Sequence, residues 1–105
     1  NFTIPTQLKA WFDRVLQAGV TFRYTDNGPV GLLEGKKAII ASGRGGVYSV
    51  GDAAAFDHQE AYLKTALAFI GITDVEIVRA EGLNMGDEAR SEGLSKANDR
   101  IAELS

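Results

Sequence analysis

A glycine-rich loop directly after a mostly apolar segment is the part of this sequence best suited to bind a ligand. The segment is Lys37 to Ala41, and the loop that follows it contains Gly43, Arg44, Gly45 and Gly46. Glycines let backbone N–H groups approach a planar or anionic ligand that side chains would hold off. Because ligands in an open α/β sheet bind beyond the carboxyl ends of the strands, the pattern predicts a backbone cradle for a cofactor. A connection whose glycines only permit tight turns is the alternative.

Other kinds of chemistry have less support. The loop lacks the Gly-Lys-Ser/Thr ending of a P-loop and the Gly-x-Gly-x-x-Gly spacing of a dinucleotide fingerprint. The chain contains no cysteine, which excludes disulfides, thiolate catalysis and cysteine-ligated metals. His58 is the only histidine, and no serine or carboxylate stands at a diagnostic spacing from it. We therefore expect neither a metal site nor an acid–base dyad.

Length and charge restrict the class of protein further. A chain of 105 residues forms at most one domain. Its net charge of −3 and the lack of a basic stripe argue against nucleic acid as a partner. No apolar run approaches the roughly 20 residues that span a bilayer. The chain begins at Asn1 rather than methionine, and Phe2 and Ile4 lead directly into an amphipathic pattern. We therefore expect it to be part of something longer.

The elements that must position the loop alternate between helices and strands. Apolar residues at helical spacing after Pro5 predict a helix that Gly19 ends. Val20 to Tyr24 predicts a short extended segment, and Asp26 to Pro29 predicts a turn. The later elements are expected to be a strand at Lys37–Ala41, a helix from about Asp57 to Ile70 that Gly71 ends, a strand at Val75–Ala80 and a helix from Met85 to Leu104.

Two strands joined by a helix predict a right-handed parallel crossover, and so an α/β fold. Parallel sheets need cover on both faces and usually more than two strands. Two strands therefore offer too little sheet surface to bury the apolar stripe of the last helix, which is formed by Leu94, Ala97, Ile101 and Leu104. We infer that the other half of the core comes from polypeptide outside this sequence.

The aromatic residues divide into core candidates and pocket candidates. Phe69 lies on the apolar stripe of its predicted helix, which is typical of a core residue. Trp11 and Phe12 lie on a predicted buried helical face, which favours the core or a subunit interface. Tyr24 and Tyr48 stand beside turn and loop signals, where exposure or the lining of a pocket is more credible.

Several short motifs stand along the chain in the order of one known family. They are Asn-Phe-Thr-Ile-Pro-Thr-Gln-Leu-Lys at residues 1–9, Ala-Gly-Val-Thr-Phe-Arg-Tyr-Thr at 18–25, Asn-Gly-Pro at 27–29, Gly-Lys-Lys-Ala at 35–38 and Phe-Ile-Gly-Ile-Thr-Asp-Val at 69–75. With the glycine loop, they resemble the C-terminal half of the FMN-dependent NADH-azoreductases. This resemblance implies a flavodoxin-like doubly wound parallel sheet, of which residues 1–105 form only the C-terminal part of a single domain, without its N-terminal strands.

The resemblance also implies roles for particular residues. Asn1 and Phe2 match the end of the family segment that contacts the isoalloxazine ring of FMN. Gly43, Arg44, Gly45 and Gly46 match the Ser-Arg-Gly-Gly loop, which contacts the same ring. Tyr24 and Phe69 match aromatics around the substrate pocket near the dimer interface. The loop departs from the family pattern because Gly43 replaces its serine and Ser42 stands one place earlier, so backbone contacts to the flavin are expected rather than a hydroxyl contact.

The activity that the resemblance implies is electron transfer from NADH through FMN to quinones and azo compounds. Because flavin N5 performs the chemistry, no catalytic side chain is required. A homodimer in the cytoplasm is also implied, as is a phosphate-binding loop outside this chain. A flavodoxin-like electron carrier and a binding module without a cofactor are the alternatives.

Overall fold

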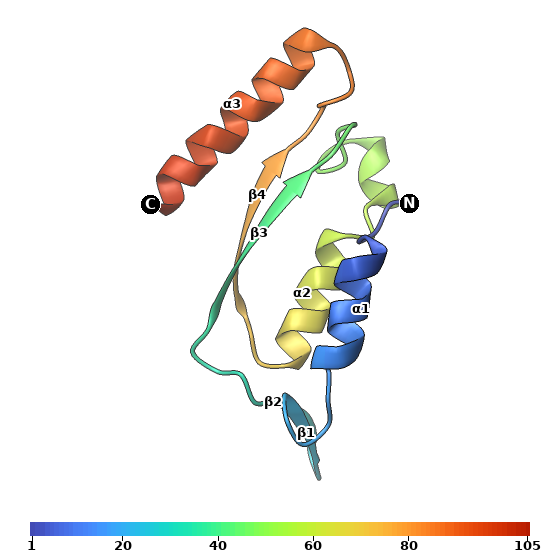
Figure 1. Cartoon of the computed structure of the whole chain (residues 1–105), viewed down its shortest axis with the longest axis vertical. Coiled ribbons are helices and arrows are strands. Elements are labelled where there is room, and N and C mark those ends of the chain that lie inside the picture. The colour runs from blue at the N-terminus through green and yellow to red at the C-terminus, as the bar shows by residue number, and fades with distance from the viewer. The chain divides into compact units, whose positions relative to one another are not determined.

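The computed structural model describes all 105 residues, and their contacts divide the chain into two compact units. Unit 1 comprises Asn1–Ala38 and Asp57–Val75, and unit 2 comprises Ile39–Phe56 and Glu76–Ser105. The elements, labelled in Figure 1, are α1 (Thr6–Val15), β1 (Phe22–Thr25), β2 (Gly28–Gly31), β3 (Lys37–Gly43), the 3-10 helix η1 (Asp52–Phe56), α2 (Glu60–Phe69), β4 (Asp74–Ala80) and α3 (Asp87–Leu104). None of the helices has the length and apolar character needed to cross a membrane.

Helix α1 of unit 1 buries one face. The carbonyl of Pro5, which precedes the helix in an extended conformation, accepts a hydrogen bond from the Lys9 backbone N–H at 3.1 Å. Phe12 is buried, and its ring meets that of Tyr62 on α2 edge to face at 5.9 Å between centroids. Trp11, expected on the same buried face, is 49% exposed. Successive helical residues differ in direction by about 100°, so adjacent residues do not share one narrow face.

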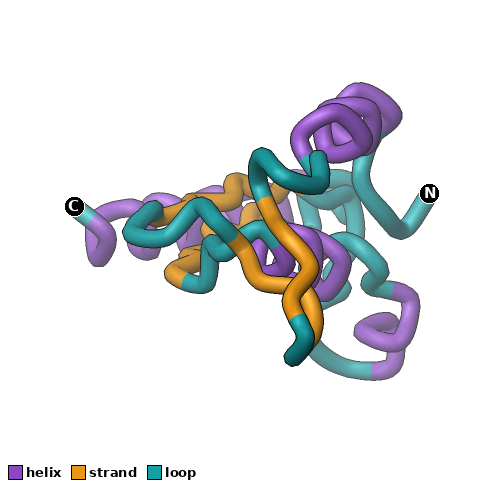
Figure 2. The backbone as a smooth tube through the Cα atoms, turned by 90° about the horizontal axis from the view of Figure 1, so that it is seen from below, coloured by secondary structure: helices purple, strands orange, loops and turns teal.

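The extended segment expected at Val20–Tyr24 is part of a β-hairpin. Strand β1 pairs antiparallel with β2 across a short turn at Asp26–Asn27, and Figure 2 shows both strands and the loop at their tip. Gly28, at φ +105°, occupies a backbone region that glycine adopts without a Cβ penalty. The predicted extension of the turn through Pro29 is wrong, because Gly28 and Pro29 open β2. Proline is tolerated there because each strand of a two-stranded sheet has a free edge.

Helix α2 begins at Glu60, three residues after the predicted start at Asp57. Oδ1 of Asp57 accepts hydrogen bonds from the backbone N–H groups of Gln59 at 2.9 Å and Glu60 at 3.2 Å. Asp57 therefore caps the first turn from outside the helix instead of forming part of it. At the other end, Gly71 has φ +102° and ends the helix as predicted.

In unit 2, β3 and β4 lie side by side and run in the same direction, which confirms the predicted parallel pairing of these two strands (Figure 1). Strand β3 continues two residues beyond the predicted end at Ala41, so Ser42 and Gly43 belong to the strand. Strand β4 ends at Ala80, as predicted. The segments that follow β3 and β4 therefore leave the sheet at the same edge.

Helix α3 begins at Asp87, after Gly86 with φ +101°, and not at the predicted Met85. Asp87 and Glu88 lie in its first turn, where the helix dipole favours negative charge. Near the other end, Arg100 forms an ion pair with Glu76 of β4. These contacts fix α3 beside β4 within unit 2.

The apolar stripe of α3 is only partly covered, as expected from a sheet of two strands, and the side chains of β3 are only partly buried. Side chains of β3 alternate in exposure, and Ile39 is 59% exposed. On α3, Ala97 is buried, whereas Leu94 is 40% and Ile101 is 50% exposed. The physical reason is that β3 has one neighbouring strand, so the sheet is too small to cover the full apolar stripe of the helix.

Candidate functional site

The glycine loop leaves the end of β3 in unit 2 and is fastened through its carbonyl groups. The carbonyls of Arg44, Gly45 and Gly46 accept hydrogen bonds from the backbone N–H groups of residues 82–84, at 3.0–3.1 Å. The Arg44 N–H donates to the carbonyl of Ala80 at 2.9 Å. The loop after β3 is therefore bonded to the segment after β4.

The N–H groups of Gly45 and Gly46 make no hydrogen bond within the chain. Because backbone N–H groups are obligatory donors, these two remain for an external acceptor. The backbone is also closely surrounded on its other side. A Cβ at Gly46 would lie 3.0 Å from the Tyr48 ring, and a Cβ at Gly45 would lie 3.2 Å from Cβ of Asn84. Two adjacent donors with little room for side chains are what a backbone cradle requires.

Arg44 is folded back into unit 2. Its side chain is 7% exposed, its Nε donates to Oγ of Ser42 at 3.2 Å, and its guanidinium lies 3.7 Å from the carboxylate of Glu81. The guanidinium carbon is 6.0 Å from the centroid of the Tyr48 ring, within cation–π range. The positive charge of Arg44 is therefore compensated by a carboxylate.

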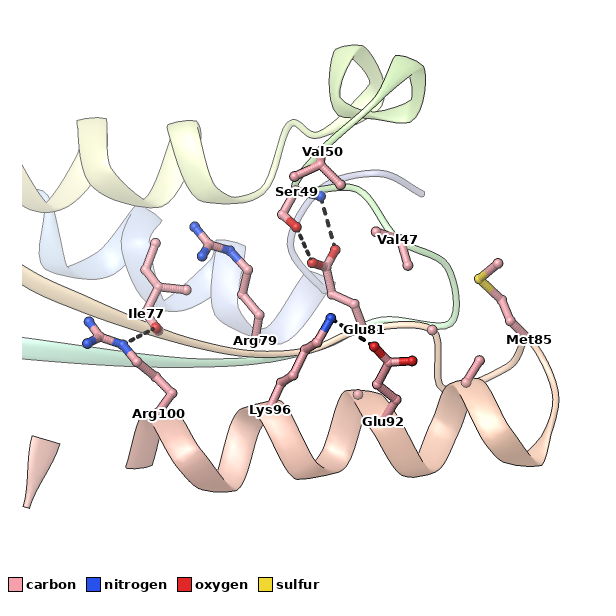
Figure 3. Close-up of a pocket in the computed structure, with 13 residues that line it drawn as sticks. Val47, Ser49, Val50, Ile77, Arg79, Glu81, Met85, Glu92, Lys96 and Arg100 are labelled. Atoms are coloured by element: carbon pink, nitrogen blue, oxygen red, sulfur yellow. Dashed lines mark hydrogen bonds and ion pairs between the residues drawn. The ribbon is translucent and has the colours of Figure 1, made fainter. Parts of the chain in front are cut away.

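Glu81 is the residue of this site that sequence reasoning missed. One carboxylate oxygen accepts hydrogen bonds from the backbone N–H groups of Tyr48 at 2.7 Å and Ser49 at 3.1 Å. The other accepts from the Ser49 hydroxyl, and Figure 3 shows the carboxylate directed at that residue. The available signal was its position directly after Ala80, because the end of a neighbouring parallel strand meets the same sheet edge as the loop.

A cavity of about 450 Å³ lies beside the loop in unit 2, lined also by β4 and α3 (Figure 3). Val47, Val50 and Met85 contribute apolar surface to it and are exposed. Lys96 also lines it but forms an ion pair with Glu92 at 3.1 Å. The cavity therefore combines apolar surface with charged side chains of both signs.

In unit 1, the predicted ring-contact residues Asn1 and Phe2 are held in a tight bend. The Phe2 carbonyl accepts a hydrogen bond from the His58 N–H at 2.8 Å, and the Thr3 hydroxyl donates to the His58 carbonyl at 3.0 Å. Oδ1 of Asn1 accepts from the Thr3 N–H at 3.0 Å. Phe2 is the one non-glycine residue with positive φ, at +61°, and its side chain is 54% exposed. A strained, anchored backbone with an exposed ring is common at binding sites.

The predicted substrate-pocket aromatics fall into both units. In unit 1, Phe22 is buried and its ring contacts Tyr24 and Phe69, with centroids 5.5 Å and 4.7 Å away. Tyr24 is 71% exposed, so the aromatic cluster reaches the surface of the hairpin. Tyr48 lies in unit 2, beside Arg44 and Gly46. In unit 1, Tyr24 and Phe69 therefore both contact the ring of Phe22. In unit 2, Tyr48 lies beside the glycine loop.

A comparison of this chain with known protein families agrees with the fold described above. Residues 1–104 match the model of a family described as having a flavodoxin-like fold. The chain belongs to this family.

Similar proteins agree with the motif resemblance. The "FMN-dependent NADH:quinone oxidoreductase 1" of Idiomarina loihiensis is 72% identical over 101 residues, covering 96% of this chain and 54% of the relative. The "FMN-dependent NADH:quinone oxidoreductase" of Azospirillum brasilense is 61% identical over 105 residues, covering 99% of this chain and 50% of the relative.

Solved structures are similar over the same extent. An azoreductase from Bacillus anthracis str. Sterne has a TM-score of 0.90 at 38% identity, covering 99% of this chain and 50% of the other. An FMN-dependent NADH-azoreductase from Bacillus anthracis str. Ames Ancestor, in complex with FMN, has a TM-score of 0.83 at 34% identity. The resemblance inferred from motifs is confirmed, and the chain spans about half the length of the relatives that it matches.

Proposed function

We propose that this chain is the C-terminal part of a flavodoxin-like domain in an FMN-dependent NADH:quinone oxidoreductase, which also reduces azo compounds. The observation that carries the proposal is the pair of unengaged N–H groups at Gly45 and Gly46, at the carboxyl end of a parallel strand. The names of the relatives and of the structural neighbours support the same assignment.

The residues present fit the isoalloxazine ring of FMN. The ring has carbonyl oxygens and ring nitrogens that accept hydrogen bonds, and Gly45 and Gly46 offer two adjacent backbone donors. Gly43 and Arg44 complete the loop. When bound, FMN supplies the redox chemistry, taking hydride from NADH and passing electrons to a quinone or azo compound.

In this proposal, the chain's own residues bind and orient the flavin ring and the substrate. The backbone donors of the loop are proposed to bind the ring through hydrogen bonds. For Asn1 and Phe2, the motif resemblance supports a role in contacting the flavin ring. Tyr24, Tyr48 and Phe69 supply aromatic surface for a flat substrate. No side chain needs to act as a nucleophile or general base.

We also propose that the complete protein is a cytoplasmic homodimer. The exposed apolar surface of unit 1 supports a subunit interface, because Tyr24 is 71% and Trp11 is 49% exposed. Use of NADH as the electron donor favours the cytoplasm, where this donor is available.

Further strands and helices of the same domain are proposed to cover unit 2. The exposed Ile39 on β3, the half-exposed Ile101 on α3 and the apolar part of the 450 Å³ cavity support this. A family member of twice this length provides enough polypeptide for that purpose.

Steady-state kinetics of the complete, FMN-loaded protein test the proposal. We expect NADH oxidation that depends on an added quinone. A flavodoxin-like electron carrier would bind FMN but would not oxidise NADH unless a separate reductase were added. A binding module would contain no flavin after purification and would gain no activity when FMN is supplied. Either of these two results would overturn the proposal.

A further inference from the structure

We propose that Glu81 is the positioning residue of the glycine loop, and that its charge keeps the loop electrically neutral beside the bound flavin. The positioning role concerns contacts within this chain alone. The charge role rests on the proposed function, because it concerns the midpoint potential of FMN in the loop.

The contacts of Glu81 join three separate points of the loop region. Its carboxylate accepts from the N–H groups of Tyr48 and Ser49, accepts from the Ser49 hydroxyl, and forms an ion pair with Arg44. These partners lie 32 to 37 residues away in the sequence, so the contacts are tertiary and not a local turn. Removing the side chain would release the segment that follows the two glycine donors.

The position of Glu81 is itself fixed by close packing. A Cβ at Gly93 of α3 would lie 2.0 Å from the carbonyl oxygen of Glu81, so only glycine permits this approach. The Glu81 side chain is 11% exposed, which leaves it little access to water. Because water screens a carboxylate with so little solvent exposure only weakly, the carboxylate interacts strongly with its charged partner.

Charge compensation is the functional consequence. Arg44 is 7% exposed, and reduction of a flavin adds negative charge to its ring. An uncompensated guanidinium would favour the reduced flavin and raise its midpoint potential. The Glu81 carboxylate, at 3.7 Å, opposes this effect. The proposal therefore predicts that the carboxylate holds the potential of the flavin below the value that Arg44 alone would set.

Two variants of the complete protein separate the two parts. Glu81→Gln keeps an oxygen acceptor for the Tyr48 and Ser49 amides but removes the charge, whereas Glu81→Ala removes both. In the FMN-free protein, we expect the Tyr48 and Ser49 amides to exchange roughly tenfold faster in Glu81→Ala, and much less so in Glu81→Gln. In the FMN-loaded protein, we expect Glu81→Gln to shift the midpoint potential to a more positive value.

Glu76→Gln is the matched control, because Glu76 also pairs with an arginine in unit 2 but does not contact the loop. We expect it to change neither the potential nor the exchange of the two amides. Unchanged amide exchange in Glu81→Ala would overturn the positioning role, whether or not the protein binds FMN. An unchanged or more negative potential in Glu81→Gln would overturn the charge role. Absence of FMN binding in the wild-type protein would instead overturn the proposed function and leave the exchange result valid.

Discussion

Gly93 of α3 and Glu81 at the end of β4 approach each other so closely that a Cβ at Gly93 would lie 2.0 Å from the Glu81 carbonyl oxygen. The contact joins the last helix to the residue whose carboxylate holds the loop after β3. Helix packing and loop geometry in unit 2 therefore depend on one glycine.

Replacing Gly93 with alanine is expected to destabilise the complete protein by about 1–3 kcal/mol, because the helix or the strand end must move to admit the methyl group. Urea unfolding measures the free energy of unfolding. Ser95→Ala, at an exposed position of the same helix, is the control and should not lower stability. Equal stability of Gly93→Ala and wild type would show that the close approach is not maintained in solution.

The loop glycines should differ in their tolerance of side chains. A Cβ at Gly43 would lie 3.7 Å from Leu83, an ordinary contact, whereas one at Gly46 would lie 3.0 Å from the Tyr48 ring. We expect Gly43→Ser to retain FMN affinity and Gly46→Ala to lose about tenfold, equivalent to about 1.4 kcal/mol. Fluorescence titration of the FMN-free protein with FMN measures both. A larger loss in Gly43→Ser than in Gly46→Ala would contradict the backbone-cradle assignment.

Asp57 should contribute to stability as a cap of α2. Asp57→Ala removes the acceptor for the Gln59 and Glu60 amides and should cost about 1 kcal/mol in unfolding free energy. Asp57→Asn keeps an oxygen acceptor and should recover most of the loss. Chemical denaturation of the three proteins measures this, and a full loss in Asp57→Asn would assign the effect to charge rather than capping.

Arg44 and Glu81 should shift the flavin potential in opposite directions. Arg44→Ala leaves the Glu81 carboxylate without this cation, so the potential should fall by tens of millivolts, where about 30 mV corresponds to about 1.4 kcal/mol for a two-electron couple. Arg44→Lys retains the charge and should remain closer to wild type. A redox titration with a reference dye measures the potential. An unchanged potential in Arg44→Ala would remove Arg44 from any electrostatic role.

The order of the main elements could be predicted from the sequence, because their apolar periods are clear. Strand β4 and the glycine stop at Gly71 are where the pattern placed them. Strand β2 was missed because its sequence, Gly28-Pro29-Val30-Gly31, is poor in β-forming residues and is specified by pairing across the hairpin.

The backbone part of the loop site could also be anticipated, whereas for Glu81 only its place at the sheet edge, and not its contacts, could be. Its chemistry depends on tertiary contacts with Arg44, Tyr48 and Ser49, which no local spacing shows. The exposure of Ile39 could not be predicted either, because a strand pattern does not state how many strands a sheet contains. The roles of Asn1, Phe2 and the pocket aromatics remain predictions.

The most direct test of the central claim is an anaerobic absorbance measurement on the complete, FMN-loaded protein. We predict that NADH bleaches the visible flavin absorbance and that a quinone then restores it. Bound FMN whose absorbance NADH does not change, in protein shown to be folded, would contradict the assignment of this chain to an NADH:quinone oxidoreductase.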